Sequence, residues 1–212
     1  MDVLLIRHGD AAGDPHRHFD PPVEGCLSHE GEAQAERLAR RLEDLSIDAF
    51  YASPLGRAIQ TAQPLARAQG RMIRVLPWLE EWRPAHVLNG GDPAEYEAMQ
   101  ARAADLPVEQ TWKTEAGESL MQMADRVIPG FLELMKEEGV HAAHGGWLLE
   151  ERAADRRMAL FGHGGTLGLL ASFILGMPLR PDSRIAFGKT GVARFEWARR
   201  GDVWYPLLRL DS

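Results

Sequence analysis

The chain has 212 residues and a mass of 23.6 kDa, and its 45% hydrophobic and 26% charged residues are close to the average for globular proteins. Its net charge of −7, with basic residues interspersed among 31 acidic ones, argues against a nucleic-acid partner, which needs clustered basic charge. The single cysteine, Cys26, excludes an intramolecular disulfide and a Cys-rich zinc site. We therefore expect one domain over residues 1–212, located in a reducing cytoplasm.

No segment is expected to target or cross a membrane. The residues before Arg7 lack a basic region and are too few for a signal peptide. The longest nearly apolar stretch, 166–177, has 12 residues, fewer than the roughly 20 that span a bilayer.

The first predicted elements are a strand and a helix. Residues 3–6 form an uninterrupted apolar run, which is typical of a strand buried on both faces, and place Arg7 and His8 at its C-terminal end. Residues 10–26 contain several glycines and prolines without a period and predict a loop. A helix is expected from an N-cap at Ser28 to about Leu45, because its apolar residues recur at helical spacing.

Two more strands and a helix follow. Residues 47–52 and 72–76 carry strand patterns. Between them, Ser53 and Pro54 predict a helix start, with the serine hydroxyl as cap and proline at the first helical position. This start places Arg57 in the first turn.

The second half repeats the alternation of helix and strand. A long amphipathic helix is predicted over 117–138, and the strand 157–161 ends in a glycine-rich turn that contains His163 and opens into another helix. Segments 188–197 and 203–210 predict a closing hairpin. The alternation predicts an α/β fold, a three-layer α/β/α sandwich with a mostly parallel sheet.

Several catalytic motifs are incomplete in this chain. Residues 188–190 read Gly-Lys-Thr like the end of a P-loop, but Ser183 stands where that motif needs glycine. Cys26 lacks the arginine that a cysteine phosphatase has six residues later, since Glu32 is there. Neither Gly-x-Ser-x-Gly nor His-Glu-x-x-His occurs.

Histidines outside these motifs are interpreted as loop residues. The segment 14–20 combines the ligand types of a metal site, His16 and His18 with two aspartates (Asp14 and Asp20), but we interpret it as a solvated loop. We interpret His141 and His144 as exposed. No metal and no cofactor is expected.

Arginine and histidine side chains are predicted to converge on one crevice. Arg7 and His8 follow the first strand, Arg57 begins a helix, and His163 follows a later strand. The C-terminal ends of parallel strands share one edge of the sheet, where ligands usually bind. Arginine forks and the helix N-terminus at Gly164 suit a phosphate group, and a neutral imidazole can attack phosphorus. The pattern predicts an anion site.

Four sequence motifs resemble the histidine phosphatase superfamily, also called the phosphoglycerate-mutase-like family. They are LIRHG at 5–9, LSHEGEAQA at 27–35, YASPLGRAIQTA at 51–62 and FGHGG at 161–165, in the order that the family has. The resemblance implies the phosphoglycerate-mutase-like fold. It also implies that His8 becomes phosphorylated.

The resemblance further implies that Arg7, Arg57 and His163 bind the phosphoryl group. The family's proton donor is a glutamate after the third strand, which maps onto Glu81, with Glu80 as the alternative. The glycine and Trp-x-Gly signature that often follows this glutamate is replaced here by residues 82–86, Trp-Arg-Pro-Ala-His. Such a site needs no metal, because arginines and histidines supply the positive charge.

The expected activity is a phosphatase acting on a small phosphorylated substrate. Mutases that resemble glycolytic phosphoglycerate mutase carry Ser-x-Trp-Asn soon after the Arg-His-Gly motif, whereas residues 10–14 here read Asp-Ala-Ala-Gly-Asp. A mutase, or a catalytically silent module that binds a phosphorylated ligand, remains an alternative. Trp82, His86 and Trp147 are candidates either for contact with the leaving group or for loop packing. The sequence predicts neither the substrate nor the oligomeric state.

Overall fold

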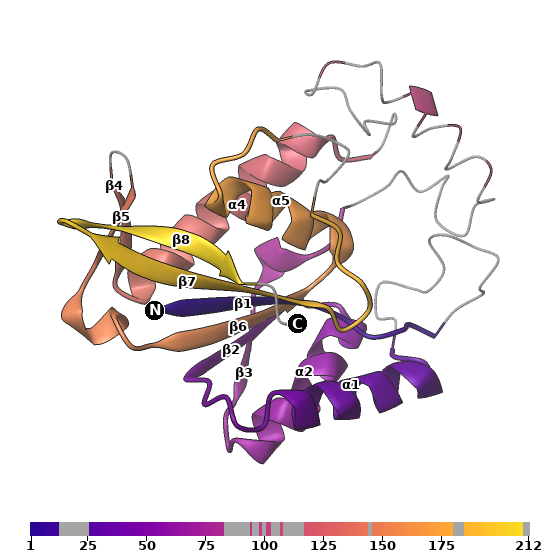
Figure 1. The fold of residues 1–212 in the computed structure, drawn as a ribbon. Helices are drawn as coiled ribbons and strands as arrows, with labels where there is room; N and C mark the ends of the chain where they lie inside the picture. The colour runs from indigo at the N-terminus through magenta and orange to yellow at the C-terminus, as the bar shows by residue number, and fades with distance from the viewer. Residues whose placement is uncertain are drawn as a thin grey trace.

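The computed structural model describes residues 1–12, 26–82, 117–143, 146–179 and 185–209, together with residues 94, 98, 101, 102 and 107. An eight-stranded sheet lies between two layers of helices (Figure 1). The helices α1 (His29–Arg41) and α2 (Gly56–Ala68) cover one face, and α4 (Leu120–Glu137) and α5 (Gly164–Ile174) cover the other. The predicted α/β/α sandwich is confirmed. No helix among the described residues has the length and apolar character needed to cross a membrane.

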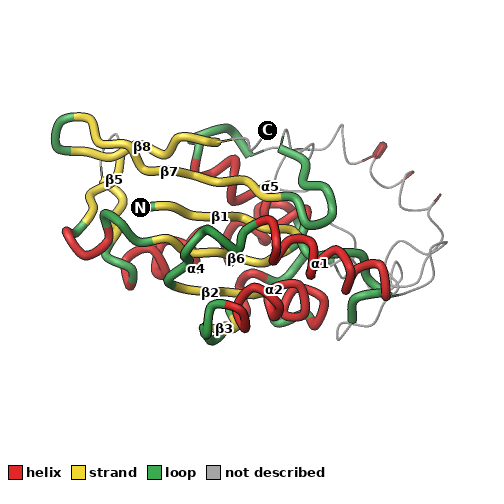
Figure 2. The backbone as a smooth tube through the Cα atoms, turned by 60° about the horizontal axis from the view of Figure 1, so that its bottom comes forward, coloured by secondary structure: helices red, strands yellow, loops and turns green. Residues whose placement is uncertain are grey.

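The sheet has a parallel half and an antiparallel half, and Figure 2 shows its strands side by side. In the parallel half the order is β3 (Ile73–Val75), β2 (Ala49–Ala52), β6 (Arg157–Gly162) and β1 (Asp2–Arg7). The sheet continues antiparallel through β7 (Val192–Arg200), β8 (Val203–Arg209), β5 (Gly146–Leu149) and β4 (Val140–Ala143). The expectation of a mostly parallel sheet therefore holds for the first half and needs correction for the second, where hairpins replace helical crossovers.

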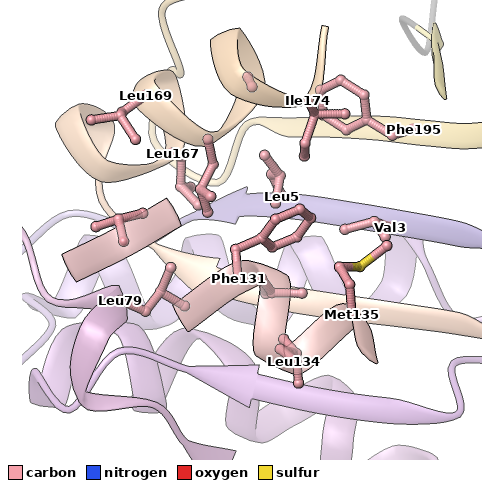
Figure 3. Packing of buried hydrophobic residues seen from close by; sticks show 14 of the residues in the cluster. Val3, Leu5, Leu79, Phe131, Leu134, Met135, Leu167, Leu169, Ile174 and Phe195 are labelled. Atoms are coloured by element: carbon pink, nitrogen blue, oxygen red, sulfur yellow. The ribbon is translucent and has the colours of Figure 1, made fainter. Parts of the chain in front are cut away.

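Strand β1 is buried on both faces, as its apolar run predicts. Val3 and Leu5 pack into the cluster with α4 and α5, whereas Leu4 and Ile6 pack into the cluster with α1 and α2. Figure 3 shows Val3 and Leu5 beside Phe131 of α4. This double burial fixes the position of the C-terminal end of β1 relative to both layers of helices.

Helix α1 begins where the sequence predicts and ends earlier. The Ser28 hydroxyl accepts a hydrogen bond from the Gly31 backbone N–H, which confirms the N-cap. The helix ends at Arg41, and residues 42–45 form a turn instead of the predicted last helical turn. Leu42 is nevertheless buried in the core below α1, so the apolar pattern continues past the end of the helix.

Helix α2 begins later than predicted. Its first residue is Gly56 and its N-cap is Leu55, which has no capping side chain. The prediction of a helix start at Ser53 and Pro54 is therefore wrong, and the Ser53 hydroxyl instead bonds to His163. Helix α4 also begins later than residue 117, at Leu120, after a capping box.

The segment 139–155 is part of the sheet and its packing, because it contains β4 and β5. Trp147 is buried, with its ring centroid 6.4 Å from that of Phe131 and 6.0 Å from that of Trp197. Trp82 is also buried, and its indole N–H donates to the Glu118 carbonyl. For both tryptophans the packing interpretation holds over contact with a leaving group, and His86 lies outside the described residues.

Candidate active site

His8 follows the last residue of β1 and is buried, with 6% of its surface exposed. Its Nδ1 lies 2.6 Å from the Gly9 carbonyl oxygen. A carbonyl only accepts hydrogen bonds, so Nδ1 carries the proton and Nε2 presents its lone pair. Burial, and secondly the charge of Arg57, lower the pKa of His8 to about 3. His8 is therefore a neutral imidazole near neutral pH.

His163 lies directly after β6, at the N-cap position of α5, and is fully buried. Its ring centroid is 5.0 Å from that of His8, with a tilt of 59°. The Nε2 atom lies 2.7 Å from the Ser53 hydroxyl, and Nδ1 is buried with no hydrogen-bond partner within the described part of the chain. Burial, and then His8 and Arg57, hold the pKa of His163 well below its usual range.

Arg7 is the last residue of β1, and its guanidinium lies against the start of α5. Its Nη1 donates to the Phe187 carbonyl at 2.6 Å. A Cβ atom added at Gly164 would lie 3.5 Å from Arg7 Cζ, so the guanidinium lies close to the first helical residue. Arg7 Nε is buried, and none of the described residues accepts a hydrogen bond from it. The N–H is left for an acceptor such as a phosphoryl oxygen.

Arg57 is the second residue of α2. The Thr61 hydroxyl donates to the Arg57 carbonyl at 2.7 Å and accepts a hydrogen bond from the Gly9 N–H at 3.0 Å. These bonds attach the first turn of α2 to the loop that follows His8. The charge of Arg57 acts on both histidines, whose pKa values it lowers.

Glu81 lies two residues after the short 3-10 helix η1 (Pro77–Leu79), and its carboxylate occupies the N-terminus of α5. One oxygen accepts a hydrogen bond from the Gly165 N–H and the other from the Thr166 N–H, both at 3.1 Å. For Glu80, the main-chain carbonyl makes the contact, as it accepts a bond from the Thr166 hydroxyl at 2.8 Å. Of the two candidate proton donors, Glu81 is therefore the one whose carboxylate binds the N-terminus of α5, directly after His163.

All six residues predicted for the site thus lie at the C-terminal edge of the parallel strands: Arg7, His8, Arg57, Glu81, His163 and Gly164. Sequence reasoning missed Ser53 and Thr61, whose hydroxyls join the site's elements across the fold. Their signal was present in the motif at 51–62, but Ser53 was interpreted as a helix cap.

Lys189 is a further cation near the site that sequence reasoning missed. It lies in a turn before β7, and the Thr190 backbone N–H in the same turn donates to the His8 carbonyl at 3.4 Å. Its Nζ is 3.6 Å from Asp10 Oδ1. Burial and the neighbouring Arg7 lower the pKa of Lys189. The Gly-Lys-Thr triplet therefore contributes a lysine near the two arginines.

The other candidate ligands do not join the site. His141 lies on β4 at the far edge of the sheet and not in a loop, so its interpretation as a loop residue is wrong, and it is 2.9 Å from a Glu150 carboxylate oxygen. The segment 14–20 and His144 lie outside the described residues. Within the described ranges, no three His, Cys, Asp or Glu side chains form a group that could hold a metal ion.

Comparison with known proteins gives consistent matches over nearly the whole chain. The model of the histidine phosphatase superfamily (branch 1) matches residues 3–206. A probable phosphoglycerate mutase GpmB of Erwinia tasmaniensis is 28% identical over 203 residues, covering 92% of this chain and 85% of that protein. Its counterpart in Escherichia fergusonii is 29% identical over 199 residues, with 93% and 85% covered.

Solved structures of phosphatases share the fold. The native mycobacterial glucosyl-3-phosphoglycerate phosphatase superposes with a TM-score of 0.77 at 24% identity, over 98% of this chain and 96% of that one. A putative alpha-ribazole-5'-P phosphatase of Escherichia coli gives a TM-score of 0.76 at 20% identity, over 99% and 95%. At these identities the likeness shows the fold alone.

Proposed function

Because the chain belongs to the histidine phosphatase superfamily, we propose that it hydrolyses a phosphomonoester through a phosphohistidine intermediate on His8. One observation carries the proposal: two neutral, buried histidines lie 5.0 Å apart beside two buried nitrogens, Arg7 Nε and His163 Nδ1, that lack a partner in the described part of the chain. A phosphoryl group placed between these side chains would supply acceptors to these nitrogens. Buried polar atoms without partners are costly, so a ligand there is physically favoured.

The proposed reaction has two steps. First, His8 Nε2 attacks phosphorus, the ester P–O bond breaks, and the leaving alkoxide takes a proton from Glu81. Arg7, Arg57, His163 and the Gly164 backbone N–H stabilise the charge on the phosphoryl oxygens. Second, the Glu81 carboxylate takes a proton from water, whose oxygen attacks phosphorus, and the P–N bond breaks. Phosphate and neutral His8 result.

No metal or cofactor takes part in the proposed mechanism, because positioning and cationic charge dominate phosphoryl transfer and the two arginines supply that charge. The proposed partner is a small phosphorylated molecule. Proteins of similar fold carry the names of different phosphatases, so the comparisons support a phosphatase in general. The sequence contains a single cysteine and cannot form an intramolecular disulfide, which fits a reducing compartment, and we propose that the enzyme acts in the cytoplasm.

A mutase is the second candidate, because several curated relatives carry the name of a probable phosphoglycerate mutase. Mutases that resemble glycolytic phosphoglycerate mutase carry a Ser-x-Trp-Asn stretch soon after the Arg-His-Gly motif. Residues 10–14 of this chain lack that stretch, and its absence favours hydrolysis over the mutase reaction. A module that only binds a phosphorylated ligand is the third. The three candidate functions can be distinguished by incubating the protein with a phosphate ester labelled in its phosphoryl group, quenching the reaction during turnover, and locating the label.

The phosphatase should release phosphate and carry an acid-labile label on His8. Transfer of label within a phosphoglycerate faster than its release would support the mutase. Tight binding of vanadate without turnover on a broad substrate panel would support the binding module. A label on His163, or none in an enzyme that turns over, would refute the assignment of the nucleophile.

The role of Glu81 has its own test. Glu81→Gln should slow hydrolysis of beta-glycerol phosphate by about 10²-fold or more, because its alkoxide leaving group needs a proton. The loss should be much smaller with para-nitrophenyl phosphate, whose leaving group departs largely unaided. Glu80→Gln is the matched control. A selective loss only in that variant would transfer the role to Glu80.

A further inference from the structure

Arg126 lies in the second turn of α4 and has no role in the mechanism proposed above. Its guanidinium group nevertheless makes several hydrogen bonds to neighbouring residues. Its Nε and Nη2 donate to the two Glu118 carboxylate oxygens at 2.7 and 2.8 Å. Both side chains are largely buried, with 18% of Arg126 and 10% of Glu118 exposed. The pair is therefore a two-pronged ion pair that solvent screens poorly, which is the strong form of this interaction.

The remaining donors of Arg126 reach the chain that leads into Glu81. Nη1 donates to the carbonyls of Trp78 and Glu80 at 2.8 and 2.9 Å, and Nη2 donates to the carbonyl of Glu81 at 3.0 Å. All five N–H groups of the guanidinium are thus used. Lysine has only three donors on one atom and cannot reproduce this planar set.

Glu81 is consequently held from two sides. Arg126 on α4 fixes the backbone at Glu80 and Glu81, and the first turn of α5 binds the Glu81 carboxylate. Glu118 holds Arg126 in place and accepts the Trp82 indole N–H on its own carbonyl. Loss of Arg126 would leave three carbonyls of the segment 78–81 without this donor, while the carboxylate would keep its contacts with α5.

We propose that Arg126 is a positioning residue for Glu81. Its ion pair with Glu118 holds the main chain so that the Glu81 carboxyl group is oriented towards the leaving group. The proposal rests on the function proposed for Glu81. Arg126 acts through the main chain and is not a catalytic residue itself. A carboxyl displaced by about 1 Å donates its proton poorly, and misplacement of this size costs about 10²-fold in rate.

The test compares Arg126→Lys with wild type on two substrates. With beta-glycerol phosphate kcat should fall by about tenfold or more while KM changes by less than about threefold, because the acid and not the phosphoryl site is disturbed. With para-nitrophenyl phosphate the fall should be less than about threefold. In a Glu81→Gln background, Arg126→Lys should cause no further loss on beta-glycerol phosphate. A purely structural role would not produce this dependence on Glu81.

Arg157→Lys is the matched control. Arg157 donates to Asp2 Oδ2 at 3.0 Å and to the Ser46 carbonyl at 2.7 Å, with 24% and 14% of the two paired side chains exposed. This pair lies at the opposite end of β1 and β6 from the site. Its substitution should lower the melting temperature without changing the ratio of the two activities.

Equal losses on both substrates, or the same loss with and without Glu81, would overturn the proposal for Arg126. If Glu81→Gln itself shows no selective loss, the proposed role of Glu81 fails instead, and the two failures are distinct. If Arg126→Lys does not fold, Glu118→Gln replaces it, because the amide keeps the shape of the pair and removes its charge. That variant must show the same selective loss, and its absence overturns the proposal.

Discussion

One added methyl group at Gly165 would displace the Glu81 carboxylate. A Cβ atom at this position would lie 2.7 Å from Glu81 Oε1 and 3.4 Å from Glu81 Cδ. The distance of 2.7 Å is shorter than the contacts that Cβ atoms make in proteins, so one of the two groups must move. Because the clashing oxygen belongs to a side chain, we expect the Glu81 carboxylate to move and the helix backbone to keep its position. The movement breaks the hydrogen bonds from the N–H groups of Gly165 and Thr166, both 3.1 Å long.

The expected effect of Gly165→Ala follows from the two roles of this contact. A positioned acid contributes about 10²- to 10⁴-fold to the rate, and a displacement near 1 Å removes about 10²-fold. Hydrolysis of beta-glycerol phosphate should therefore slow by about 10²-fold, and that of para-nitrophenyl phosphate by less than about tenfold. Stability should change by less than about 1 kcal/mol, because alanine is the better helix former. Initial rates on both substrates and urea unfolding measure these effects.

Gly164→Ala is the neighbouring control. A Cβ at Gly164 meets Arg7 Cζ at 3.5 Å, an ordinary contact, and alanine keeps the backbone N–H at this position. We expect at most about a threefold loss on either substrate. A wild-type rate of Gly165→Ala on beta-glycerol phosphate, or an equal loss in both variants, would refute this account of Glu81.

Three further predictions concern pH, metal and backbone strain. Because the pKa of His8 is lowered from 6.5 to about 3, the unfolded chain binds a proton that the native chain does not bind between these pH values, so stability falls as the pH decreases below about 6.5. At pH 5 the loss from His8 amounts to about 2 kcal/mol, so in urea unfolding at pH 7 and pH 5 wild type should lose about that much more stability than His8→Asn, which keeps His163 with its own lowered pKa. Exhaustive chelation should leave phosphate release unchanged, whereas a loss restored by one divalent ion would contradict metal independence. Thr190 has a φ of +52°, so Thr190→Gly should raise stability by about 1 kcal/mol in thermal unfolding, and a lower melting temperature would contradict the strain.

The parallel half of the fold could be predicted because its signals are local. The continuous apolar run of β1 has alternate residues buried against opposite layers, so the lack of alternation itself indicates a central strand. The same reasoning places the residues after β1 and β6 at one edge of the sheet. His8 and His163, 155 positions apart in the sequence, meet there for that reason.

Long-range side-chain partners explain what the sequence could not predict. Ser53 followed by Pro54 has the pattern of a helix start, yet its hydroxyl lies 2.7 Å from a nitrogen of His163, 110 positions away. Arg126 has the pattern of a polar residue on an amphipathic helix, and its partners near residue 80 depend on how α4 packs against η1. In both cases a tertiary contact determines the role of a residue whose local pattern fits a simpler one.

Gly164 and Gly165, the first two residues of α5, lie beside different side chains. This explains how one helix end can contribute both to the phosphoryl site and to the binding of Glu81. A side chain at Gly164 would make only an ordinary contact with the Arg7 guanidinium, whereas the absent side chain at Gly165 leaves room for the Glu81 carboxylate. The positive end of the helix dipole favours any anion placed there. In the proposed mechanism, the phosphoryl group shares this helix end with Glu81, which donates a proton to the leaving alkoxide and then, as a carboxylate, activates water.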